Sequence, residues 1–244
     1  MPKEKRIVAN MTNASISFDK RTVLDNVTIE LDSGTILGLI GPSGAGKTTT
    51  IKCLMGMEKL DQGTAEIFGN RMPDRKVLGR VGYMGQSDAL YEELTAKENL
   101  VFFGNLMGLT GSALEDAMTK KMELVNLMPF MDKAVKTYSG GMKRRLSLAI
   151  TLLANPDLII LDEPTVGIDP SLRVTIWEQL RALAEDQKAI IVTTHVMDEA
   201  EKCDHVGLII DGKLFALGTP SELKKAFHAE SIEEVFLKAE VRVQ

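Results

Sequence analysis

A glycine-rich loop between an apolar segment and a helical segment constrains the fold of this chain more than any other feature. Residues 41–48 have the sequence Gly-Pro-Ser-Gly-Ala-Gly-Lys-Thr and fit the pattern GxxxxGK[ST], in which glycines let consecutive backbone amides curl around phosphate oxygens. The apolar run Ile36–Ile40 predicts a buried strand before the loop, and a helix is expected from about Lys47 to Gly56. This strand–loop–helix order is the context that the pattern requires, so the segment predicts a nucleotide-phosphate site.

Each part of the loop has an expected role in that site. Lys47 is expected to reach the β- and γ-phosphates, and the hydroxyl of Thr48 is expected to ligate Mg²⁺. The N-terminus of the helix directs its positive dipole end at the same phosphates. The residues expected to contact the nucleotide are Gly41, Pro42, Ser43, Gly44, Ala45, Gly46, Lys47, Thr48 and Thr49.

A second apolar run ends in two carboxylates. Leu158–Leu161 has the pattern of a central parallel strand, and Asp162 and Glu163 follow it directly. In parallel α/β sheets the chemistry lies at the carboxyl ends of the strands. Asp162 is therefore expected to hold Mg²⁺ through its water shell, and Glu163 to accept a proton from the attacking water.

The remaining segments predict an α/β chain with a helical middle. The early part is expected to be antiparallel and strand-rich, and residues from about Ser87 to Asn155 are expected to be mostly helical. Ser112, with Glu115 in capping-box spacing, is the expected N-cap of one of these helices. The expected strands are Ala14–Phe18, Val27–Leu31, Ala65–Phe68, Ala189–Thr194, Val206–Ile210 and Leu214–Leu217; the expected helices are Glu98–Met107, Ser112–Met128, Ser139–Ala154 and Leu172–Asp186.

Composition narrows the class of protein. The 244 residues suit one large domain, and a net charge of −5 argues against nucleic acid as the main partner. Cys53 and Cys203 are far apart in the sequence and predict reduced thiols, with neither a disulfide framework nor a zinc site. Apolar stretches such as Leu146–Ala154 are too short to span a bilayer, and the charged start, Met1–Arg6, does not predict a signal peptide.

A second glycine motif identifies a family. Ser139, Gly140 and Gly141 lie within the sequence Tyr-Ser-Gly-Gly-Met, after the phosphate loop and just before the strand that ends in acids. Ser139 is a good N-cap, and paired glycines allow a phosphate to approach closely. In this order the motifs resemble those of ATP-binding-cassette (ABC) ATPases, and the resemblance covers essentially the whole chain. Tyr138 and Met142 stand where the family commonly has Leu and Gln.

The resemblance implies further site residues. Gln86 resembles the Q-loop glutamine, which takes part in catalysis and in the Mg²⁺ site, and His195 resembles the switch histidine that contacts the γ-phosphate. Asp169 resembles the D-loop residue that links two nucleotide sites. Phe18 lies where the family usually has an aromatic residue that stacks on adenine.

The resemblance is strongest to the ATPase subunits of ABC-2-type exporters. They share the YSGGM form, the segment Glu163–Pro170 and a tail similar to Ser231–Leu237. This implies an α/β fold with a P-loop NTPase core and a parallel sheet, an N-terminal antiparallel β subdomain and an α-helical insert that carries the signature motif. Residues 1–244 would form one ABC ATPase domain, with a core of about 1–86 and 156–244 and a helical subdomain of about 87–155.

The same resemblance implies an assembly. ATP with Mg²⁺ would lie between the phosphate loop of one subunit and the signature motif of another, in a head-to-tail dimer of this chain or with a homologous ATPase subunit. The dimer would power an integral-membrane permease encoded on a separate chain. The expected location is cytoplasmic, peripheral on the inner face of the cell membrane.

Two other functions stay open at this point. A soluble ABC ATPase of a non-transport complex, such as one for Fe–S cluster assembly, has a similar length, although the YSGGM and EPTVGIDP segments argue against it. A GTPase or a small-molecule kinase would leave the signature motif unexplained, and the chain has no NKxD guanine motif.

Two other features have simpler interpretations. Lys143, Arg144 and Arg145 are interpreted as a solvated helix face in preference to a nucleic-acid patch, because the chain is acidic. Apolar residues of the tail recur at helical spacing, which predicts an amphipathic helix that either caps the core or contacts another subunit: Ile232, Val235, Phe236 and Ala239.

Overall fold

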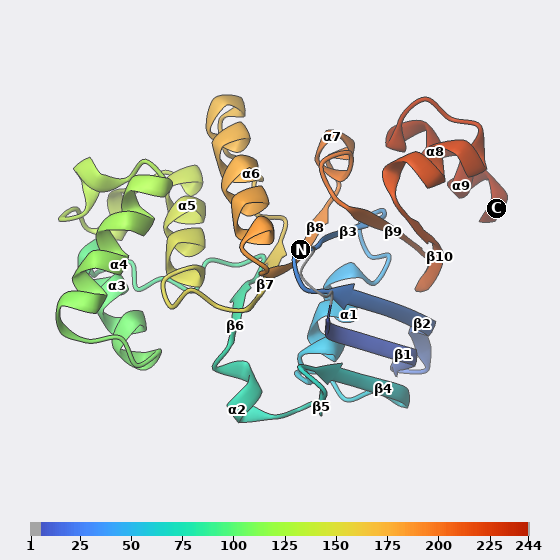
Figure 1. Cartoon of the computed structure of the whole chain (residues 1–244), viewed down its shortest axis with the longest axis horizontal. Helices are drawn as coiled ribbons and strands as arrows, with labels where there is room; N and C mark the ends of the chain where they lie inside the picture. Colours follow the sequence, from blue (N-terminus) through green and yellow to red (C-terminus); the bar gives the residue numbers. More distant parts are fainter. Residues whose placement is uncertain (1–5, 244) are drawn as a thin grey trace. The chain divides into compact units, whose positions relative to one another are not determined.

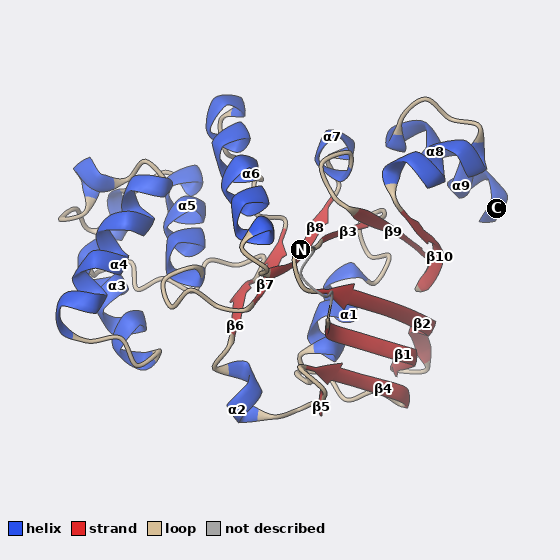
Figure 2. Ribbon diagram, viewed as in Figure 1, coloured by secondary structure: helices blue, strands red, loops and turns tan. Residues whose placement is uncertain are grey.

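The computed structural model describes residues 6–243, which divide into two compact units (Figures 1 and 2). The first unit contains the chain up to Leu78 and again from Leu183, and the second contains Gly79–Ala182. The prediction about a signal peptide concerns mainly residues 1–5, which lie outside the described part of the chain. The predicted α/β class is confirmed by the elements of both units.

An antiparallel sheet forms the N-terminal part of the first unit. The three strand segments expected there correspond to strands of this sheet, although each strand begins several residues earlier than predicted and the third ends at Ile67, one residue before the predicted end. Apolar side chains alternate with polar ones over residues 27–31 of β2, so that Val27, Ile29 and Leu31 are buried. In spatial order the strands are β2 (Arg21–Asp32), β1 (Ile7–Phe18), β4 (Gln62–Ile67) and β5 (Asn70–Arg71).

The first unit also contains parallel strands around β3 (Ile36–Ile40). β3 pairs in parallel with β8 (Ala189–Thr194) on one side and with β9 (His205–Ile210) on the other. Every residue of β3 and β8 is buried, which explains why β3 and residues 189–192 of β8 are apolar runs. β10 (Lys213–Gly218) then pairs antiparallel with β9 through a tight turn, so the predicted hairpin is confirmed.

Among the described residues, five helices lie entirely in the first unit. The predicted tail helix is confirmed, and Ile232, Val235 and Ala239 are fully buried, as expected if this helix caps the core of its own unit. Glu201 fixes the start of the tail, because its carboxylate accepts the N–H of Ile232 at 2.9 Å. The helices are α1 (Lys47–Leu54), α2 (Arg75–Leu78), α7 (Met197–Ala200), α8 (Pro220–Phe227) and α9 (Ile232–Val243).

The second unit combines two parallel strands with a group of helices. β6 (Val81–Met84) was not expected from the sequence, and it pairs with the predicted strand β7 (Leu158–Asp162). Three helices pack on one another, as Figure 2 shows: α3 (Ala96–Leu106), α4 (Gly111–Leu124) and α5 (Gly140–Thr151). The short 3₁₀ turns Met128–Phe130 and Val135–Thr137 connect α4 to α5, and α6 (Pro170–Glu185) runs from this unit into the first.

One capping prediction in the second unit is wrong. Helix α4 already begins at Gly111, and Thr110 is its N-cap, so Ser112 lies inside the first turn and cannot cap it. A capping box that the sequence analysis did not identify begins α3: the Thr95 hydroxyl accepts the Glu98 N–H at 3.1 Å, and the Glu98 carboxylate accepts the Thr95 N–H at 2.8 Å. Within residues 6–243, no helix has both the length and the apolar character needed to cross a membrane.

Candidate functional site

The phosphate loop of the first unit connects β3 to α1, as the sequence predicts. Gly46 has φ +108°, and a Cβ on it would lie 2.7 Å from Leu24 Cδ2 and 3.0 Å from Val23 O. Only glycine accepts this backbone and this close packing without strain. The Ala45 carbonyl accepts the Gly212 N–H at 3.1 Å, so the turn between β9 and β10 fixes the loop from another side.

The start of α1 has the character of an anion site. The helix has no side-chain cap at Gly46 and no acidic residue in its first turn. First-turn amides have no acceptor inside a helix, and the helix dipole adds positive potential at the same end. The Lys47 ammonium lies over the loop and donates to the carbonyls of Gly41 at 2.7 Å and Pro42 at 3.0 Å. These groups fit the phosphates of a nucleotide.

His195 and the phosphate loop follow neighbouring strands. Ile40 of β3 is in register with Thr194 of β8, so Gly41 and His195 leave the sheet at the same edge. The Thr194 hydroxyl donates to the Glu199 carboxylate at 2.7 Å and accepts the Val196 N–H at 3.0 Å. Glu199 is buried, so the backbone on both sides of the exposed His195 is tied to the first turn of α7.

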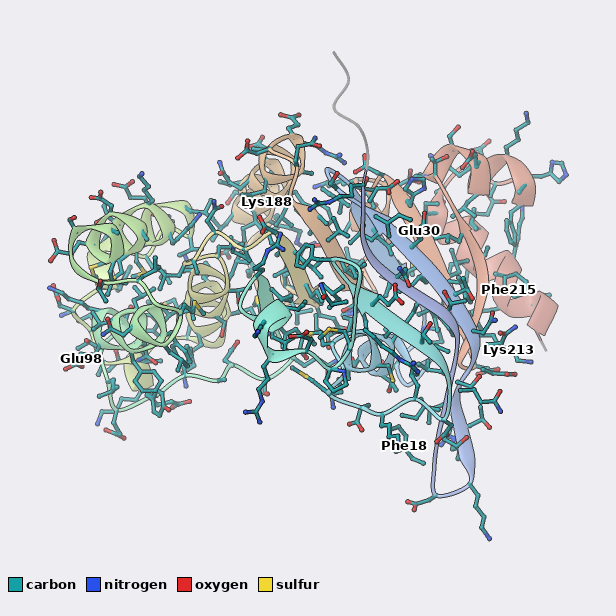
Figure 3. The ribbon with its side chains drawn as sticks, turned by 60° about the horizontal axis from the view of Figure 1, so that its bottom comes forward. Phe18, Glu30, Glu98, Lys188, Lys213 and Phe215 are labelled. Carbon is teal, nitrogen blue, oxygen red and sulfur yellow. The ribbon has the colours of Figure 1, made fainter. Side chains whose placement is uncertain are left out.

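Phe18 is exposed at the end of β1, as a residue that stacks on a ligand would need to be (Figure 3). It is paired with Arg21 across the hairpin turn between β1 and β2. The same hairpin packs on the phosphate loop through Val23 and Leu24. The aromatic ring and the loop therefore belong to one continuous part of the first unit.

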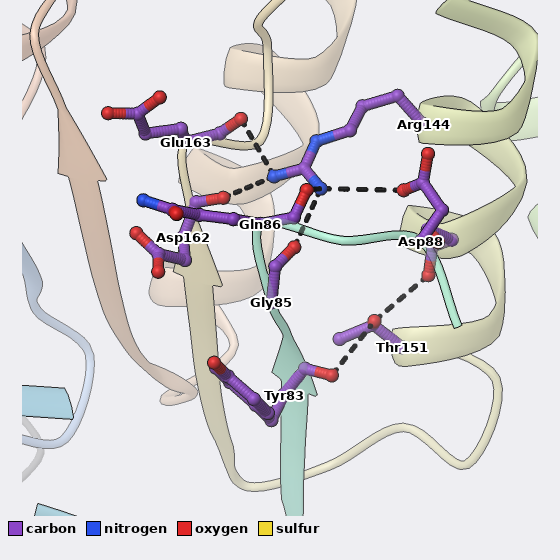
Figure 4. Close-up of polar contacts among 9 residues, drawn as sticks. Tyr83, Gly85, Gln86, Asp88, Arg144, Thr151, Asp162 and Glu163 are labelled. Atoms are coloured by element: carbon purple, nitrogen blue, oxygen red, sulfur yellow. Dashed lines mark hydrogen bonds and ion pairs between the residues drawn. The ribbon is translucent and has the colours of Figure 1, made fainter. Parts of the chain in front are cut away.

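The second unit brings three of the predicted polar side chains together. Met84 of β6 is in register with Leu161 of β7, so Gln86 follows one strand where Asp162 and Glu163 end the other. Figure 4 shows the amide of Gln86 and the carboxylates of Asp162 and Glu163 pointing to one side. Asp162 is fully buried, whereas Gln86 is exposed. A cluster of oxygen atoms at a strand edge suits proton transfer and the binding of a hard cation.

The charges of Asp162 and Arg144 affect the pKa of the neighbouring Tyr83. The pKa of Tyr83, on β6, is raised first by burial and then by the negative charge of Asp162, while the charge of Arg144 acts in the opposite direction.

Glu163 has φ +54°, a left-handed backbone that is uncommon for a residue with a side chain. Strained backbone of this kind is concentrated at functional sites, where surrounding contacts hold it.

The prediction of a solvated basic face on α5 is wrong for Arg144. Its side chain is buried, and its guanidinium donates to the carbonyls of Gly85, Gln86, Asp162 and Glu163 (Figure 4). Sequence reasoning missed this residue because three consecutive basic residues are typical of an exposed face. The available signal was Leu148, an apolar residue four positions after Arg144 and therefore on the same face of the helix.

The signature segment has the capped helix that the sequence predicts. The Ser139 hydroxyl accepts the Met142 N–H at 3.3 Å, and Ser139 and Gly140 are exposed at the start of α5. Gly141 packs so closely on the turn after β7 that a Cβ there would lie 2.5 Å from Gly167 O. That turn leads to Asp169, which is also exposed.

Tyr138 has a local structural explanation where the family commonly has Leu. Its ring is buried and packs edge-on against Phe130, with ring centroids 6.4 Å apart. Its hydroxyl donates to Phe130 O at 2.8 Å, which satisfies the polar end of a buried tyrosine. Burial also raises the pKa of this hydroxyl.

Within residues 6–243, no three histidine, cysteine or carboxylate side chains form a cluster that could hold a metal ion by themselves.

Comparison with known structures supports the fold. A solved ATP-binding subunit of an ABC transporter superposes with a TM-score of 0.89 at 28% identity, covering 95% of this chain and 99% of that chain. The ADP conformation of an ATP-binding cassette of an ABC transporter superposes with a TM-score of 0.79 over 94% of this chain and 98% of that chain; at 23% identity this likeness concerns the fold alone.

Several curated relatives have names that refer to export. The chain is 40% identical over 220 residues to Nod factor export ATP-binding protein I of Sinorhizobium fredii, covering 89% of this chain and 64% of that protein. It is 39% identical over 236 residues to the protein of the same name from Paraburkholderia xenovorans, covering 93% and 78%. It is also 39% identical over 236 residues to ABC transporter G family member 20 of Dictyostelium discoideum, covering 96% and 32%.

These relatives are longer than this chain, which spans slightly less than two-thirds of the Sinorhizobium protein. A family model described as ABC transporter matches residues 24–166. That match contains the phosphate loop, Gln86, the signature segment and both acids at the end of β7. The chain therefore belongs to the ABC transporter family, as an ATP-binding domain.

Proposed function

We propose that this chain binds and hydrolyses ATP to power a membrane exporter of the ABC-2 type. The observation that carries the proposal is the set of three side chains, Gln86, Asp162 and Glu163, that point to one side at the ends of β6 and β7. The export role is supported by relatives at about 40% identity that are named as export ATP-binding proteins. The proposed domain has a core of about 1–86 and 156–244 and a helical subdomain of about 87–155.

The phosphate loop is proposed to bind the triphosphate. Amides of the first turn of α1 and the ammonium of Lys47 face the phosphate oxygens, which favours binding of a polyanion. Phe18 stacks on the adenine. The other contacts are proposed to come from Gly41, Pro42, Ser43, Gly44, Ala45, Gly46, Thr48 and Thr49.

Three oxygen-bearing side chains are proposed to hold Mg²⁺: the hydroxyl of Thr48, the amide of Gln86 and the carboxylate of Asp162. All three offer the hard ligands that this ion prefers. When bound, Mg²⁺ neutralises charge that develops on the transferred phosphoryl group.

Glu163 is proposed to be the general base. A water oxygen attacks the γ-phosphorus, the bond from that phosphorus to the β–γ bridging oxygen breaks, and ADP leaves while Glu163 accepts the proton of the water. His195 donates to the γ-phosphate, and Gln86 helps to orient the water. These roles need a carboxylate that is ionised and correctly aimed before the reaction begins.

The complete site is proposed to need a second subunit, either another copy of this chain or a homologue. Ser139, Gly140 and Gly141 of one subunit face the γ-phosphate bound by the other, and Asp169 links the two sites. The support is the exposed, glycine-rich start of α5, where first-turn amides and the helix dipole favour an anion. Loss of the γ-phosphate then removes the ligand that holds the two subunits together.

The partner that uses this cycle is proposed to be an integral-membrane permease on a separate chain, with the ATPase on the cytoplasmic face. Purification of the tagged chain from gently solubilised membranes checks this part. A multispanning membrane protein that copurifies in stoichiometric amount supports the transporter role. Copurification of a soluble complex alone contradicts it.

Glu163→Gln tests the catalytic part of the proposal. The variant should still bind ATP and should form an ATP-dependent dimer on size exclusion, but its turnover should fall by about 10²–10⁴-fold because general-base catalysis is lost. Glu115→Gln is the matched control, since Glu115 is exposed on α4 and its substitution removes the same charge. A wild-type rate in Glu163→Gln would exclude the general-base role.

Ser139→Arg tests whether the signature segment acts on the nucleotide of the other subunit. The variant should bind nucleotide normally, because the phosphate loop is unchanged, while hydrolysis and ATP-dependent dimerisation are lost. Unchanged ATPase activity would contradict the two-subunit site.

A further inference from the structure

Arg144 is a buried cation that faces backbone carbonyls. Its exposed fraction is 6%, and it projects from α5 toward the ends of β6 and β7 (Figure 4). Nη1 donates to Gly85 O at 2.6 Å and to Gln86 O at 3.2 Å. Nη2 donates to Glu163 O at 2.9 Å and also to Asp162 O.

A buried guanidinium is costly unless its charge and its donors are satisfied. The carboxylate of Asp88 is 3.4 Å from Nη1, at the long end of hydrogen-bond range, so it is a weaker partner than the closest carbonyls. The main interactions of the charge are therefore with four carbonyl oxygens from two separate segments. Arginine suits this arrangement because its planar fork presents several donors in fixed directions.

Three of the four carbonyls belong to Gln86, Asp162 and Glu163, whose side chains we call the acid cluster, and the fourth belongs to the neighbouring Gly85. The guanidinium contacts the backbone of Gln86, Asp162 and Glu163 on one side, and their side chains point to the other side (Figure 4). In this way Arg144 fixes where each backbone segment lies without occupying the space in which a substrate would bind. The left-handed backbone of Glu163, at φ +54°, is among the groups that it holds.

We propose that Arg144 is a positioning residue for hydrolysis: it aligns the Gln86 amide and the Glu163 carboxylate through their backbones. The inference rests on the proposed function, because it assumes that Glu163 is the base. Arg144 is not a catalytic residue, since it acts through groups that touch the substrate. Its loss would let two strand-end loops relax, and a misplacement of about 1 Å in such groups can lower a rate by about 100-fold.

Arg145 provides a matched control on the same helix. Its guanidinium also donates to two backbone carbonyls, Val125 O at 3.0 Å and Asn126 O at 3.2 Å. These carbonyls follow α4 and are not part of the acid cluster. Arg145→Met therefore removes the same charge and two hydrogen bonds to backbone carbonyls, half the number that Arg144 makes, without releasing Gln86 or Glu163.

Arg144→Met should lower kcat by about 10- to 100-fold, the usual effect of losing a residue that holds a functional group in place through hydrogen bonds. KM for ATP should change by less than about threefold, because the phosphate loop still binds the nucleotide. Arg144→Lys keeps the charge and part of the donor set, so its kcat should lie between those of Arg144→Met and wild type. Arg145→Met should keep a rate within about threefold of wild type. Circular dichroism and thermal unfolding show whether each variant is folded.

A double-mutant cycle with Glu163→Gln separates positioning from a general structural effect. If Arg144 acts through Glu163, adding Arg144→Met to Glu163→Gln should lower the residual rate by less than about threefold. Hydrogen exchange should become faster at Gln86 and Glu163 in Arg144→Met but not in Arg145→Met. This readout does not depend on activity.

Several results would overturn the inference. They are a wild-type kcat in a folded Arg144→Met or Arg144→Lys variant, equal losses in Arg144→Met and Arg145→Met, and an undiminished effect of Arg144→Met in the Glu163→Gln background. Failure of the proposed function looks different, because Glu163→Gln alone would then retain wild-type turnover. If Arg144→Met does not fold, the Arg144→Lys comparison decides.

Discussion

The paired glycines at the start of α5 should respond oppositely to the same substitution. A Cβ on Gly141 would lie 2.5 Å from the carbonyl oxygen of Gly167, whereas a Cβ on Gly140 would have no atom of the described residues within 4 Å. Neither glycine has a positive φ, so alanine fits the backbone at both positions. Gly140→Ala and Gly141→Ala therefore differ mainly in one backbone contact.

The magnitude of the difference follows from that contact. Both alanines gain about 0.5–1 kcal/mol from the conformational entropy of glycine in a helix, and this gain cancels in the comparison. At Gly141 the backbone of α5 and the turn at Gly167 must separate by roughly 1 Å, and such overpacking costs about 1–3 kcal/mol. We therefore expect Gly140→Ala to be slightly stabilising and Gly141→Ala to be less stable than Gly140→Ala by about 1–3 kcal/mol.

Thermal unfolding of the purified variants, without nucleotide, measures this difference. For a chain of this size, 1 kcal/mol shifts Tm by about 2–4 °C, so the two variants should differ by about 2–12 °C. Working without nucleotide excludes any effect of the glycines on ATP binding. Equal Tm values, or a lower Tm for Gly140→Ala, would refute the proposed packing of Gly141 on Gly167. The same displacement would move Asp169, so Gly141→Ala should also lower ATPase activity.

Two further predictions concern the α3 capping box and the buried thiols. Thr95→Ala should lower the free energy of unfolding by about 1 kcal/mol, the usual value of an N-cap, whereas Thr110→Ala should change it little because Thr110 makes no side-chain cap hydrogen bond. Hydrogen bonds from Thr95 lower the pKa of Glu98 below its ordinary value of 4.5. The ionised carboxylate therefore stabilises the fold at pH values above 4.5, and this contribution is lost as the pH falls through the lowered pKa. The effect of Thr95→Ala in urea unfolding should therefore be smaller at pH 3 than at pH 7, and an equal effect would contradict the pairing. Burial, followed by the charges of Glu58 and Asp61, raises the pKa of Cys53 to about 11, so in a Cys203→Ala variant a thiol reagent at pH 8 should label only unfolded protein; rapid labelling of the folded form would contradict this.

The sequence was most informative at positions where the structure accepts only one kind of residue. The phosphate loop needs glycines that accept unusual backbone angles, and Gly46 at φ +108° shows why. β3 and residues 189–192 of β8 are apolar runs because both faces of each strand are buried. Acids placed directly after such a run could lie only at the carboxyl end of a strand, so the position of Asp162 was predictable.

The sequence was least informative where a side chain acts on distant backbone. Arg144 contacts carbonyls that are 18 and 19 residues away on one side and 58 and 59 residues away on the other. Backbone carbonyls occur at every position, so no sequence pattern marks them as partners. The composition of residues 143–145 then favoured an exposed face, and only the packing of α5 shows that its middle residue is buried. The capping prediction at Ser112 failed because the helix already begins at Gly111, which places Ser112 inside its first turn.

Helix α5 carries two groups of the proposed chemistry, Ser139 and Arg144, on one rigid element. Ser139 caps its N-terminus, and Arg144 lies five positions later on the same helix, with its guanidinium on the backbone of Glu163. If the signature segment faces the nucleotide of another subunit, binding at Ser139 and the alignment of Glu163 are mechanically connected through little more than one helical turn. Thermodynamic linkage then requires the connection to act in both directions, so that a change in the alignment of Glu163 alters the affinity of the signature segment. Arg144→Met should therefore weaken ATP-dependent dimerisation even in the Glu163→Gln background, where hydrolysis cannot contribute. Analytical ultracentrifugation over a range of ATP concentrations measures that shift, and identical dimerisation of the single and double variants would show that Ser139 and Arg144 act independently.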